Sequence, residues 1–319
     1  MEFSTATLKA LVDLARQGEG HTRPNPPVGA FVFARDGRII GRGWHHKAGE
    51  NHAEVEAIAD WKKHHPRTKA HALLVTLEPC SRPGRVGACT EAIIRAQIPR
   101  VTYLCPDPNP KNRGRAQAAL ADYGIVCEYL PYEPAADLVR AFAKRVKTGL
   151  PYVTVKLAMT LDGKIADNWG EAKWISSAAS RQKTGELRER VDAIMVGAGT
   201  VRKDDPSLLA HGRPNPDLVR VVVSRSGRLP ENAQIFTDGK NETLVFGNPH
   251  TALAELGRRG FNHVLCEGGK VLAASLAELG LVDEWLTVLC PKVIGERHVG
   301  EAAVFGGGKL EDVFVCLRA

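Results

Sequence analysis

Apolar and polar residues alternate along the chain in blocks that predict two series of helices and strands. Near the N-terminus, apolar positions are spaced three and four apart, as on one face of a helix. They are Leu8, Leu11, Val12 and Ala15. Two apolar runs within residues 28–44 flank an Asp-Gly pair, which predicts a β-hairpin. Helix-like segments at 52–61, 89–96 and 115–123 then alternate with strand-like segments at 71–77, 101–105 and 125–130.

A second series follows a break near residue 150. Residues 133–149 predict an amphipathic helix that ends at Gly149, and Pro151 just beyond is a stop signal. Downstream, strand-like segments at 153–159, 193–197, 219–224, 243–247, 263–267 and 284–290 alternate with helices at 178–190, from 251 and from 270. Such alternation predicts crossover units in a sheet with helices on its faces. We therefore expect two α/β domains, at 1–148 and 149–319.

The composition is that of a globular protein, since 44% of the 319 residues are hydrophobic and 25% are charged. No apolar run approaches the roughly 20 residues that span a bilayer. The first residues also lack the basic stretch and apolar block of a secretory signal. We expect a cytoplasmic protein with no membrane partner.

Seven cysteines, an odd number in a long chain of this kind, argue against a disulfide framework. Reduced thiols in a close pair hold a metal more readily than they cross-link. Five cysteines lie in or beside apolar segments and are predicted to be small core residues. These are Cys105, Cys127, Cys266, Cys290 and Cys316.

The formal net charge of +7 suits either nucleic-acid binding or recognition of small phosphorylated ligands. Charge alone does not separate these classes. The basic residues are scattered, however, without a dense cluster interleaved with aromatic residues. We therefore expect a small phosphorylated substrate and no nucleic-acid partner.

Three short segments predict a metal site in the first domain. His52 and Glu54 form a His-Ala-Glu triplet at the start of a predicted helix, Cys80 follows a predicted strand after Pro79, and Cys89 starts the next helix. One imidazole and two thiolates suit zinc. Three protein ligands leave one tetrahedral position for water, as in a catalytic site, whereas a purely structural zinc would need a fourth ligand nearby.

Glu54 is the predicted proton carrier. A glutamate two residues after the histidine does not easily share the metal, but it can face the water bound there. The arrangement resembles the zinc-dependent nucleobase deaminases, in which the glutamate moves protons. Each of the three segments is a weak signal by itself, and the prediction depends on all three occurring together.

The spacing of the two cysteines indicates which deaminase family the sequence resembles. Eight residues separate Cys80 from Cys89, whereas many cytidine and tRNA-adenosine deaminases have two. The longer loop resembles the bifunctional deaminase/reductase family of riboflavin biosynthesis. The likeness covers nearly the whole chain, including RPNPPVGAFVF, VTLEPCSRPGRVGACTEAI, PYVTVKLAMTLDGKIA, VGAGTVRKDDPSL and GLVDEWL. It implies a three-layer cytidine-deaminase-like domain followed by a dihydrofolate-reductase-like domain.

The resemblance assigns roles in the first domain. It implies that His52, Cys80 and Cys89 bind Zn²⁺ and that Glu54 is catalytic. It also implies that Asn25 and His45 contact the pyrimidine of the substrate. In the loop between the cysteines, Arg82 and Arg85 offer donors for a phosphate. The implied substrate is 2,5-diamino-6-ribosylamino-4(3H)-pyrimidinone 5′-phosphate.

The second domain lacks the Gly-rich fingerprint of a Rossmann dinucleotide site, although glycines follow two predicted strands at 197–199 and 268–269. The resemblance implies an NADPH-dependent reductase that converts the ribosyl group to ribityl, and a homo-oligomer formed through this domain. The implied substrate residues are Lys156, Arg188, Asp204 and Glu267. The implied cofactor residues are Trp174, Thr200, Asp204 and Gly269.

Several positions depart from the family pattern. Ala172 stands where serine is usual, His211 where arginine is usual, and Ser224 with Arg225 where Asp-Ser is usual, at a site that faces the cofactor. These departures leave open a monofunctional deaminase with a catalytically inactive reductase-like domain. Another alternative, a tRNA or nucleoside deaminase with an unrelated appendage, predicts a two-residue cysteine spacing and an aromatic-rich basic channel that this sequence lacks.

Overall fold

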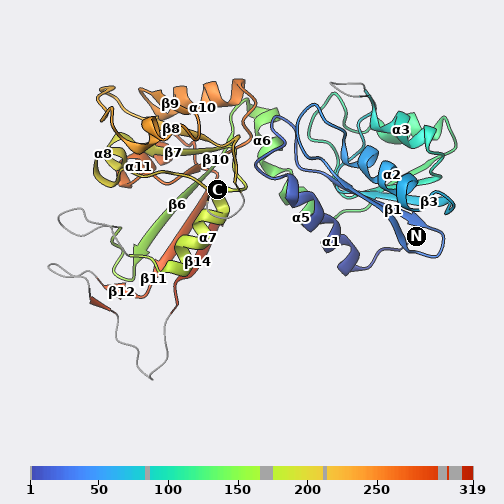
Figure 1. Ribbon diagram of the computed structural model, residues 1–319, viewed down its shortest axis with the longest axis horizontal. Coiled ribbons are helices and arrows are strands. Elements are labelled where there is room, and N and C mark those ends of the chain that lie inside the picture. Colours follow the sequence, from blue (N-terminus) through green and yellow to red (C-terminus); the bar gives the residue numbers. More distant parts are fainter. Residues whose placement is uncertain are drawn as a thin grey trace. The chain divides into compact units, whose positions relative to one another are not determined.

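Two α/β units make up the computed structural model, Met1–Gly149 and Leu150–Ala319 (Figure 1). The structure describes residues 2–82, 87–165, 175–210, 214–293, 300–301 and 311–318. Each unit has its own sheet and its own buried cores.

The first unit is built on a five-stranded sheet with the order β2-β1-β3-β4-β5. Its strands are β1 Gly29–Ala34, β2 Ile39–Trp44, β3 Ala70–Val75, β4 Arg100–Tyr103 and β5 Val126–Tyr129. Its helices are α1 Thr5–Ala15, α2 Ala53–His64, α3 Cys89–Arg95, α4 Ala116–Ala121, α5 Glu133–Leu138 and α6 Arg140–Thr148. The predicted hairpin is confirmed as the antiparallel pair β1–β2, whereas β3, β4 and β5 run parallel.

Alternating side chains of β1 place helices on both faces of this sheet. Ala30 and Val32 lie in a core with residues of α2 and α3. Phe31 and Phe33 point the other way, into a core with α1 and α5. Three residues of the predicted apolar face of α1, Leu8, Leu11 and Val12, lie in that core, and the fourth, Ala15, is also buried. The three-layer arrangement is confirmed.

The amphipathic helix predicted over residues 133–149 is two helices in the structure. α5 ends at Leu138 and α6 begins at Arg140, because Val139 leaves the helical conformation with φ −97° and ψ 3°. Val139 is 1% exposed and lies in the core beneath α1. Gly149 ends α6 with a positive φ of 78°, a conformation that glycine adopts without strain.

The second unit contains a seven-stranded sheet with the order β14-β11-β6-β10-β7-β8-β9. Its strands are β6 Tyr152–Thr160, β7 Ala193–Gly197, β8 Val219–Val223, β9 Thr243–Phe246, β10 His263–Cys266, β11 Glu284–Cys290 and β14 Val313–Arg318. A separate pair joins β12 Lys292–Val293 to β13 Gly300–Glu301. All neighbours in the large sheet are parallel except β14, which pairs antiparallel with β11.

Helices cover both faces of this second sheet as well. They are α7 Ala178–Arg188, α8 Ala198–Asp204, α9 Gln234–Thr237, α10 Pro249–Arg258 and α11 Lys270–Glu278. Met195 of β7 packs in the core shared with α10 and α11, whereas its neighbour Ile194 packs against residues of α8 and α9. Helix α8 was not predicted, since two glycines near its start weaken the local helix signal. It is stabilised by burial of Val201.

The cysteine predictions hold for three of the five residues placed in cores. Cys105, Cys266 and Cys290 are buried, and Cys127 is half-buried. The prediction is wrong for Cys316, which is exposed on β14 and donates a hydrogen bond from Sγ to Oε1 of Glu284 at 2.6 Å. β14 is an edge strand, and all its residues except Phe314 are exposed although its sequence is apolar.

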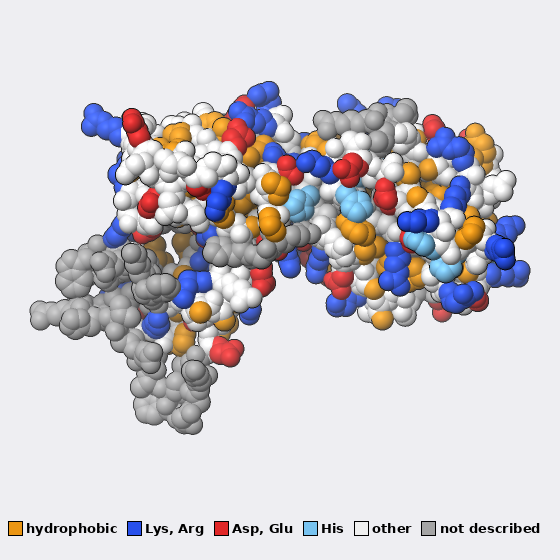
Figure 2. Space-filling view, viewed as in Figure 1, with side chains coloured by type: hydrophobic (Ala, Val, Ile, Leu, Met, Phe, Trp, Pro, Cys, Tyr) orange, Lys and Arg blue, Asp and Glu red, His pale blue; other side chains and the backbone are white. Residues whose placement is uncertain are grey.

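Basic side chains are spread over both units on the face shown in Figure 2, among acidic and neutral ones. The positive net charge is therefore not gathered into one patch on that face. Among the described residues, no helix has the length and apolar character needed to cross a membrane.

Helix α2 approaches strand β2 so closely that only glycine fits at two positions of the strand. A Cβ atom on Gly41 would lie 2.2 Å from the carbonyl oxygen of Ala57. A Cβ atom on Gly43 would lie 2.3 Å from the backbone nitrogen of Ala57 and 2.5 Å from the carbonyl oxygen of Ala53. Since backbone atoms cannot move aside independently, these glycines set the distance between helix and sheet.

We expect Gly43→Ala to lower the free energy of unfolding by about 1–3 kcal/mol, because the added methyl group pushes α2 away from the sheet. Urea unfolding followed by circular dichroism measures this change. Gly87→Ala is the control, since nothing lies within 4 Å of a Cβ atom there. Equal stability of the two variants would contradict the close-packing argument.

His263 of β10 gives the second unit a specific sensitivity to acid. Burial lowers the pKa of its imidazole from 6.5 to about 4, against the opposing effect of Glu284 and Asp283. Its Nε2 lies 2.9 Å from Oγ1 of Thr154 on the neighbouring strand. The folded protein therefore favours neutral His263, whereas the unfolded chain takes up a proton below pH 6.5.

We expect the unfolding free energy to fall as the pH drops from about 6.5 to about 4, by at most about 3 kcal/mol from this residue. Urea unfolding at several pH values and constant ionic strength measures this change. His263→Asn should show a shallower loss over this range, and an unchanged slope would exclude His263 as the cause.

Candidate active sites

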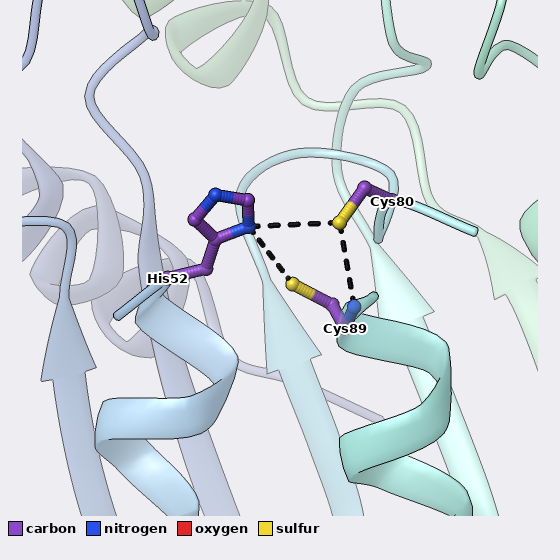
Figure 3. A group of neighbouring side chains, drawn as sticks. All are labelled: His52, Cys80 and Cys89. Carbon is purple, nitrogen blue, oxygen red and sulfur yellow. Dashed lines mark hydrogen bonds between the residues drawn. The ribbon is translucent and has the colours of Figure 1, made fainter. Parts of the chain in front are cut away.

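Three side chains from separate elements converge in the first unit, as Figure 3 shows. His52 is the residue before α2, Cys80 follows β3, and Cys89 is the first residue of α3. Nδ1 of His52 lies 3.1 Å from Sγ of Cys89 and 3.5 Å from Sγ of Cys80. The backbone nitrogen of Cys89 donates to Sγ of Cys80 at 3.3 Å. The predicted metal-binding residues are thus brought together.

The donor atoms of this cluster fit zinc. One nitrogen and two sulfur atoms all lie within 4.8 Å of one another, which a single ion can bridge. Hydrogen bonding from Cys89, and then from His52, lowers the pKa of the Cys80 thiol to about 4 against the effect of burial. The Cys80 thiol therefore favours the thiolate, which is the form that binds metal, whereas its hydrogen bond to Cys80 and burial raise the pKa of Cys89.

Glu54 lies in the first turn of α2, two residues after His52, and is 3% exposed. Burial raises the pKa of its carboxyl group, and the nearby His52 opposes this rise. A raised pKa makes the carboxylate a better proton acceptor. Its position beside the cluster, rather than within it, suits proton transfer more than metal binding.

A cavity of about 360 Å³ opens onto this cluster, and its wall includes His52, Glu54 and Cys80. Asn25 and His45 also line it, and Nδ2 of Asn25 lies 3.0 Å from Nε2 of His45. The other ring nitrogen of His45 lies 3.0 Å from the carbonyl oxygen of Asn51. Burial lowers the pKa of His45, which therefore favours the neutral form. Both side chains are held in fixed orientations.

Of the two predicted phosphate ligands, the structure describes Arg82 alone. Arg82 is exposed and is absent from the cavity wall among the described residues. Arg85 lies outside the described residues.

The cavity wall also contains polar residues that we did not predict, which are Glu78, Asp107, Asn109, Asn112 and Arg145. Asp107 accepts hydrogen bonds from the backbone nitrogen of Asn109 at 2.8 Å and from Nδ2 of Asn112 at 3.1 Å. The segment follows β4, whose carboxyl end lies beside that of β3. Polar residues directly after two parallel strands were the available signal for this part of the site.

Glu78, which follows β3, forms hydrogen bonds that hold the segment after β4 in place. Its carboxylate accepts hydrogen bonds from the backbone nitrogens of Asp107, Gly114 and Ala116, at 3.1 to 3.2 Å. The side chain is 3% exposed, so the three bonds replace the water that burial removes. Glu78 also lines the cavity, two residues before Cys80. One buried carboxylate thereby links the segment that carries Cys80 to the segment that follows β4.

In the second unit, one cavity of about 390 Å³ gathers most of the residues predicted for reduction. Lys156 comes from β6, whereas Thr200 and Asp204 come from α8. Arg188, Glu267 and Gly269 complete this group of predicted residues. Arg181, Thr184 and Ser176 line the cavity too and were not predicted. Trp174, Ala172 and His211 lie outside the described residues.

Arg188 and Glu267 form a two-point ion pair at the wall of this cavity. Nε and Nη2 of Arg188 donate to the two carboxylate oxygens of Glu267, at 2.7 and 2.9 Å. Nη1 donates to the carbonyl oxygen of Leu209 at 3.1 Å. Arg188 therefore holds Glu267 in place, and an anionic ligand must rely more on Lys156 and Arg181.

A further cavity of about 930 Å³ adjoins this one at the carboxyl ends of β7, β8 and β9. Gly199 lines the larger cavity, and the next residue, Thr200, lines the smaller one. Likewise, Gly269 lines the smaller cavity and Lys270 lines the larger one. The first turns of α8 and α11 thus form a shared wall. Ser224, Arg225 and Arg202 line the larger cavity.

Comparisons with known proteins agree across both units. The RibD C-terminal domain family matches residues 151–315, and the cytidine and deoxycytidylate deaminase zinc-binding region matches residues 1–105. The riboflavin biosynthesis protein RibD of Aquifex aeolicus is 36% identical, over 92% of this chain and 89% of the relative. RibD of Escherichia coli is 33% identical, over 94% and 90%.

Solved structures extend the likeness to the fold. The diaminohydroxyphosphoribosylaminopyrimidine deaminase/5-amino-6-(5-phosphoribosylamino)uracil reductase of Thermotoga maritima has a TM-score of 0.85 and 32% identity, covering 98% of this chain and 97% of that one. RibD of Acinetobacter baumannii has a TM-score of 0.80 and 31% identity, with the same coverage. The alternative of an inactive reductase half is not supported, since both halves match. The chain belongs to the RibD family of bifunctional riboflavin-biosynthesis enzymes, in which a zinc-dependent deaminase is followed by an NADPH-dependent reductase.

Proposed function

We propose that the His52, Cys80 and Cys89 cluster holds the zinc ion for deamination and that Glu54 is the proton carrier. The observation that carries this proposal is the buried Glu54 carboxylate on the same cavity wall as the metal-ligand cluster. The substrate is 2,5-diamino-6-ribosylamino-4(3H)-pyrimidinone 5′-phosphate, and the amino group at its C2 leaves as ammonia.

Zinc, when bound, supplies the Lewis acidity that makes water nucleophilic at neutral pH. Glu54 accepts a proton from this water and donates it to a ring nitrogen, and a second transfer releases ammonia. The raised pKa of Glu54 favours uptake of the proton from the water. Burial of the carboxylate also keeps bulk water from exchanging that proton.

Asn25 and His45 orient the pyrimidine ring in this proposal. An amide offers both a donor and an acceptor to the edge of a heterocycle, and the bond between these two side chains fixes that amide. Asp107 and Asn109 stand on the cavity wall with acceptors and donors for the amino and hydroxyl groups of the substrate. Arg82 and Arg85 remain our candidates for its phosphate.

In the second unit, we propose that Lys156 binds the ribose phosphate and that Glu267, held by Arg188, hydrogen-bonds the sugar where reduction takes place. Asp204 lies on the same wall and is the second candidate for a sugar hydroxyl. NADPH, when bound, supplies the hydride that reduces C1′ of the ribosyl group. Thr200 and Gly269 lie at the wall shared by the two cavities and would hold the cofactor there.

The described residues fit a dinucleotide phosphate. The larger cavity has three cationic side chains, Arg202, Arg225 and Lys270, and a buried hydroxyl, Oγ of Ser224, without a hydrogen-bond partner among the described residues. A cofactor lying along both cavities would supply that partner. A cytoplasmic location, a homo-oligomer formed through the reductase half and the absence of a nucleic-acid partner stay predictions.

We expect purified protein to hold about one zinc ion per chain. Cys80→Ser should lower the zinc content by more than about tenfold after dialysis, because a hydroxyl group is a poor substitute for a thiolate. Metal analysis by mass spectrometry measures the content. Cys127→Ser, a half-buried cysteine of the same unit outside the cluster, should keep its zinc. Equal retention by both variants would contradict the assigned ligands.

We expect Glu54→Gln to slow ammonia release by about 10²- to 10⁴-fold while its zinc content stays normal, because glutamine cannot carry the proton. The assay follows ammonia and the absorbance of NADPH together. Adding the already deaminated substrate should restore NADPH consumption in this variant, which tests the reductase half separately. Glu56→Gln on the same helix is the control. Wild-type ammonia release by Glu54→Gln would exclude the proton-carrier role.

A further inference from the structure

Helix α6 contributes a cation to the cavity of the first unit that the proposed chemistry leaves without a role. Among the described residues of the cavity wall, Arg145 is the only lysine or arginine, and Phe142 and Val146 of the same helix lie beside it on that wall. Its side chain is half-buried. Zinc binding, proton transfer and recognition of the pyrimidine ring are assigned to other residues. The contacts of Arg145 therefore indicate what it does.

Arg145 forms a hydrogen bond with a segment 121 residues earlier in the chain. Its Nη2 donates to the carbonyl oxygen of Pro24 at 2.7 Å. The central carbon of the guanidinium group lies 5.6 Å from the centre of the Phe142 ring, which is within range for cation–π attraction. The helix thereby holds the guanidinium group in place, and the guanidinium group holds the carbonyl group. Because the donor is charged, this hydrogen bond is stronger than one between neutral groups.

The carbonyl group of Pro24 belongs to the turn that presents Asn25 to the cavity. Within this turn, the backbone nitrogen of Asn25 donates to the carbonyl oxygen of Thr22 at 2.9 Å, and Oγ1 of Thr22 donates to the carbonyl oxygen of Asn25 at 3.1 Å. The turn precedes β1, so its backbone lacks the hydrogen bonds between strands that fix a residue inside a sheet. Arg145 holds this turn at Pro24, and His45 holds it at the amide of Asn25.

We propose that Arg145 is a positioning residue of the deaminase, which holds Asn25 against the pyrimidine ring through the carbonyl group of Pro24. This inference rests on the proposed deaminase function and adds the residue that orders its ring-binding amide. With Arg145 in place, the turn is ordered before the substrate arrives. Without Arg145, part of the binding free energy is used to order the turn, so the affinity falls. Proton transfer by Glu54, on another helix, continues at nearly the same rate once the ring is bound.

The test compares Arg145→Ala and Arg145→Lys with the wild-type full-length protein in the ammonia assay. Arg145→Ala should raise KM by about tenfold to a hundredfold, as expected for loss of a charge-assisted hydrogen bond, and change kcat by less than about threefold. Arg145→Lys should recover part of this loss, because an ammonium group still donates to the carbonyl oxygen. Zinc content, and NADPH consumption with the already deaminated substrate, should stay at the wild-type level in both variants.

Arg140→Ala is the matched control. Arg140 begins the same helix, forms an ion pair with Asp137 of α5, and is absent from the described lining of the cavity. This variant removes the same kind of side chain from α6 and should keep the wild-type KM. Calorimetric titration of the substrate into proteins that also carry Glu54→Gln measures affinity without turnover. There, Arg145→Ala should raise Kd by the same factor as it raises KM.

A double-mutant cycle separates positioning from direct contact with the substrate. If Arg145 acts through Asn25, Arg145→Ala should have less than about a twofold further effect on KM once Asn25→Ala has removed the amide. The losses from the two single variants should therefore not add. The substrate without its 5′-phosphate provides a second comparison, since a positioning residue should affect KM for both compounds by the same factor.

Other results would overturn the proposal in distinguishable ways. Losses that add in the cycle, or a loss confined to the phosphorylated compound, would make Arg145 a direct ligand of the substrate. Loss of zinc in both Arg145 variants would make its role structural. A wild-type KM in Arg145→Ala would mean that the bond to Pro24 does not orient Asn25, while the proposed deaminase function stands. If the wild-type protein neither releases ammonia nor binds the substrate, the proposed function fails together with this inference.

Discussion

Parallel strands end at the same edge of a sheet, and both active sites of this protein depend on that constraint. In the first unit, Cys80 follows β3 and Asp107 follows β4, so the ends of two neighbouring strands supply residues to one cavity. In the second unit, Ser224 follows β8 and Glu267 follows β10. The backbone leaves the sheet at these points, and its side chains are no longer needed for core packing.

Buried charges hold these loops in place. The Glu78 carboxylate accepts hydrogen bonds from three backbone N–H groups. The Glu267 carboxylate accepts two hydrogen bonds from the guanidinium group of Arg188. Arg220, which is 1% exposed, donates hydrogen bonds to both carboxylate oxygens of Asp238 and so fixes the turn before β9. Each group is costly to bury alone, since an unpaired buried charge destabilises a protein by about 3–5 kcal/mol. The pairing therefore confines each loop to one arrangement.

The two reactions act on different parts of one substrate. Deamination changes the pyrimidine ring, and reduction changes the ribosyl group, while the phosphate is untouched in both. Each cavity must therefore recognise a ring, a sugar and a phosphate, but place a different bond at the reacting position. Each cavity has a polar pair held by its own hydrogen bonds, Asn25–His45 in one unit and Arg188–Glu267 in the other. Rigid pairs of this kind orient a substrate at little entropic cost.

Local sequence patterns determined the α/β character of both units, the hairpin, the buried face of α1, and the cluster of His52, Cys80 and Cys89 with Glu54 beside it. These features follow from periodicity, or from residues next to element ends, where the chain itself limits the geometry. The break at Val139, the helix after Gly197 and the exposure of Cys316 depended on tertiary packing, because a residue pattern does not reveal which neighbours cover it. The Glu78 anchor joins residues 29 to 38 positions apart, and the Arg188–Glu267 pair spans 79. Only the folded sheet, by setting distant strand ends side by side, decided those contacts.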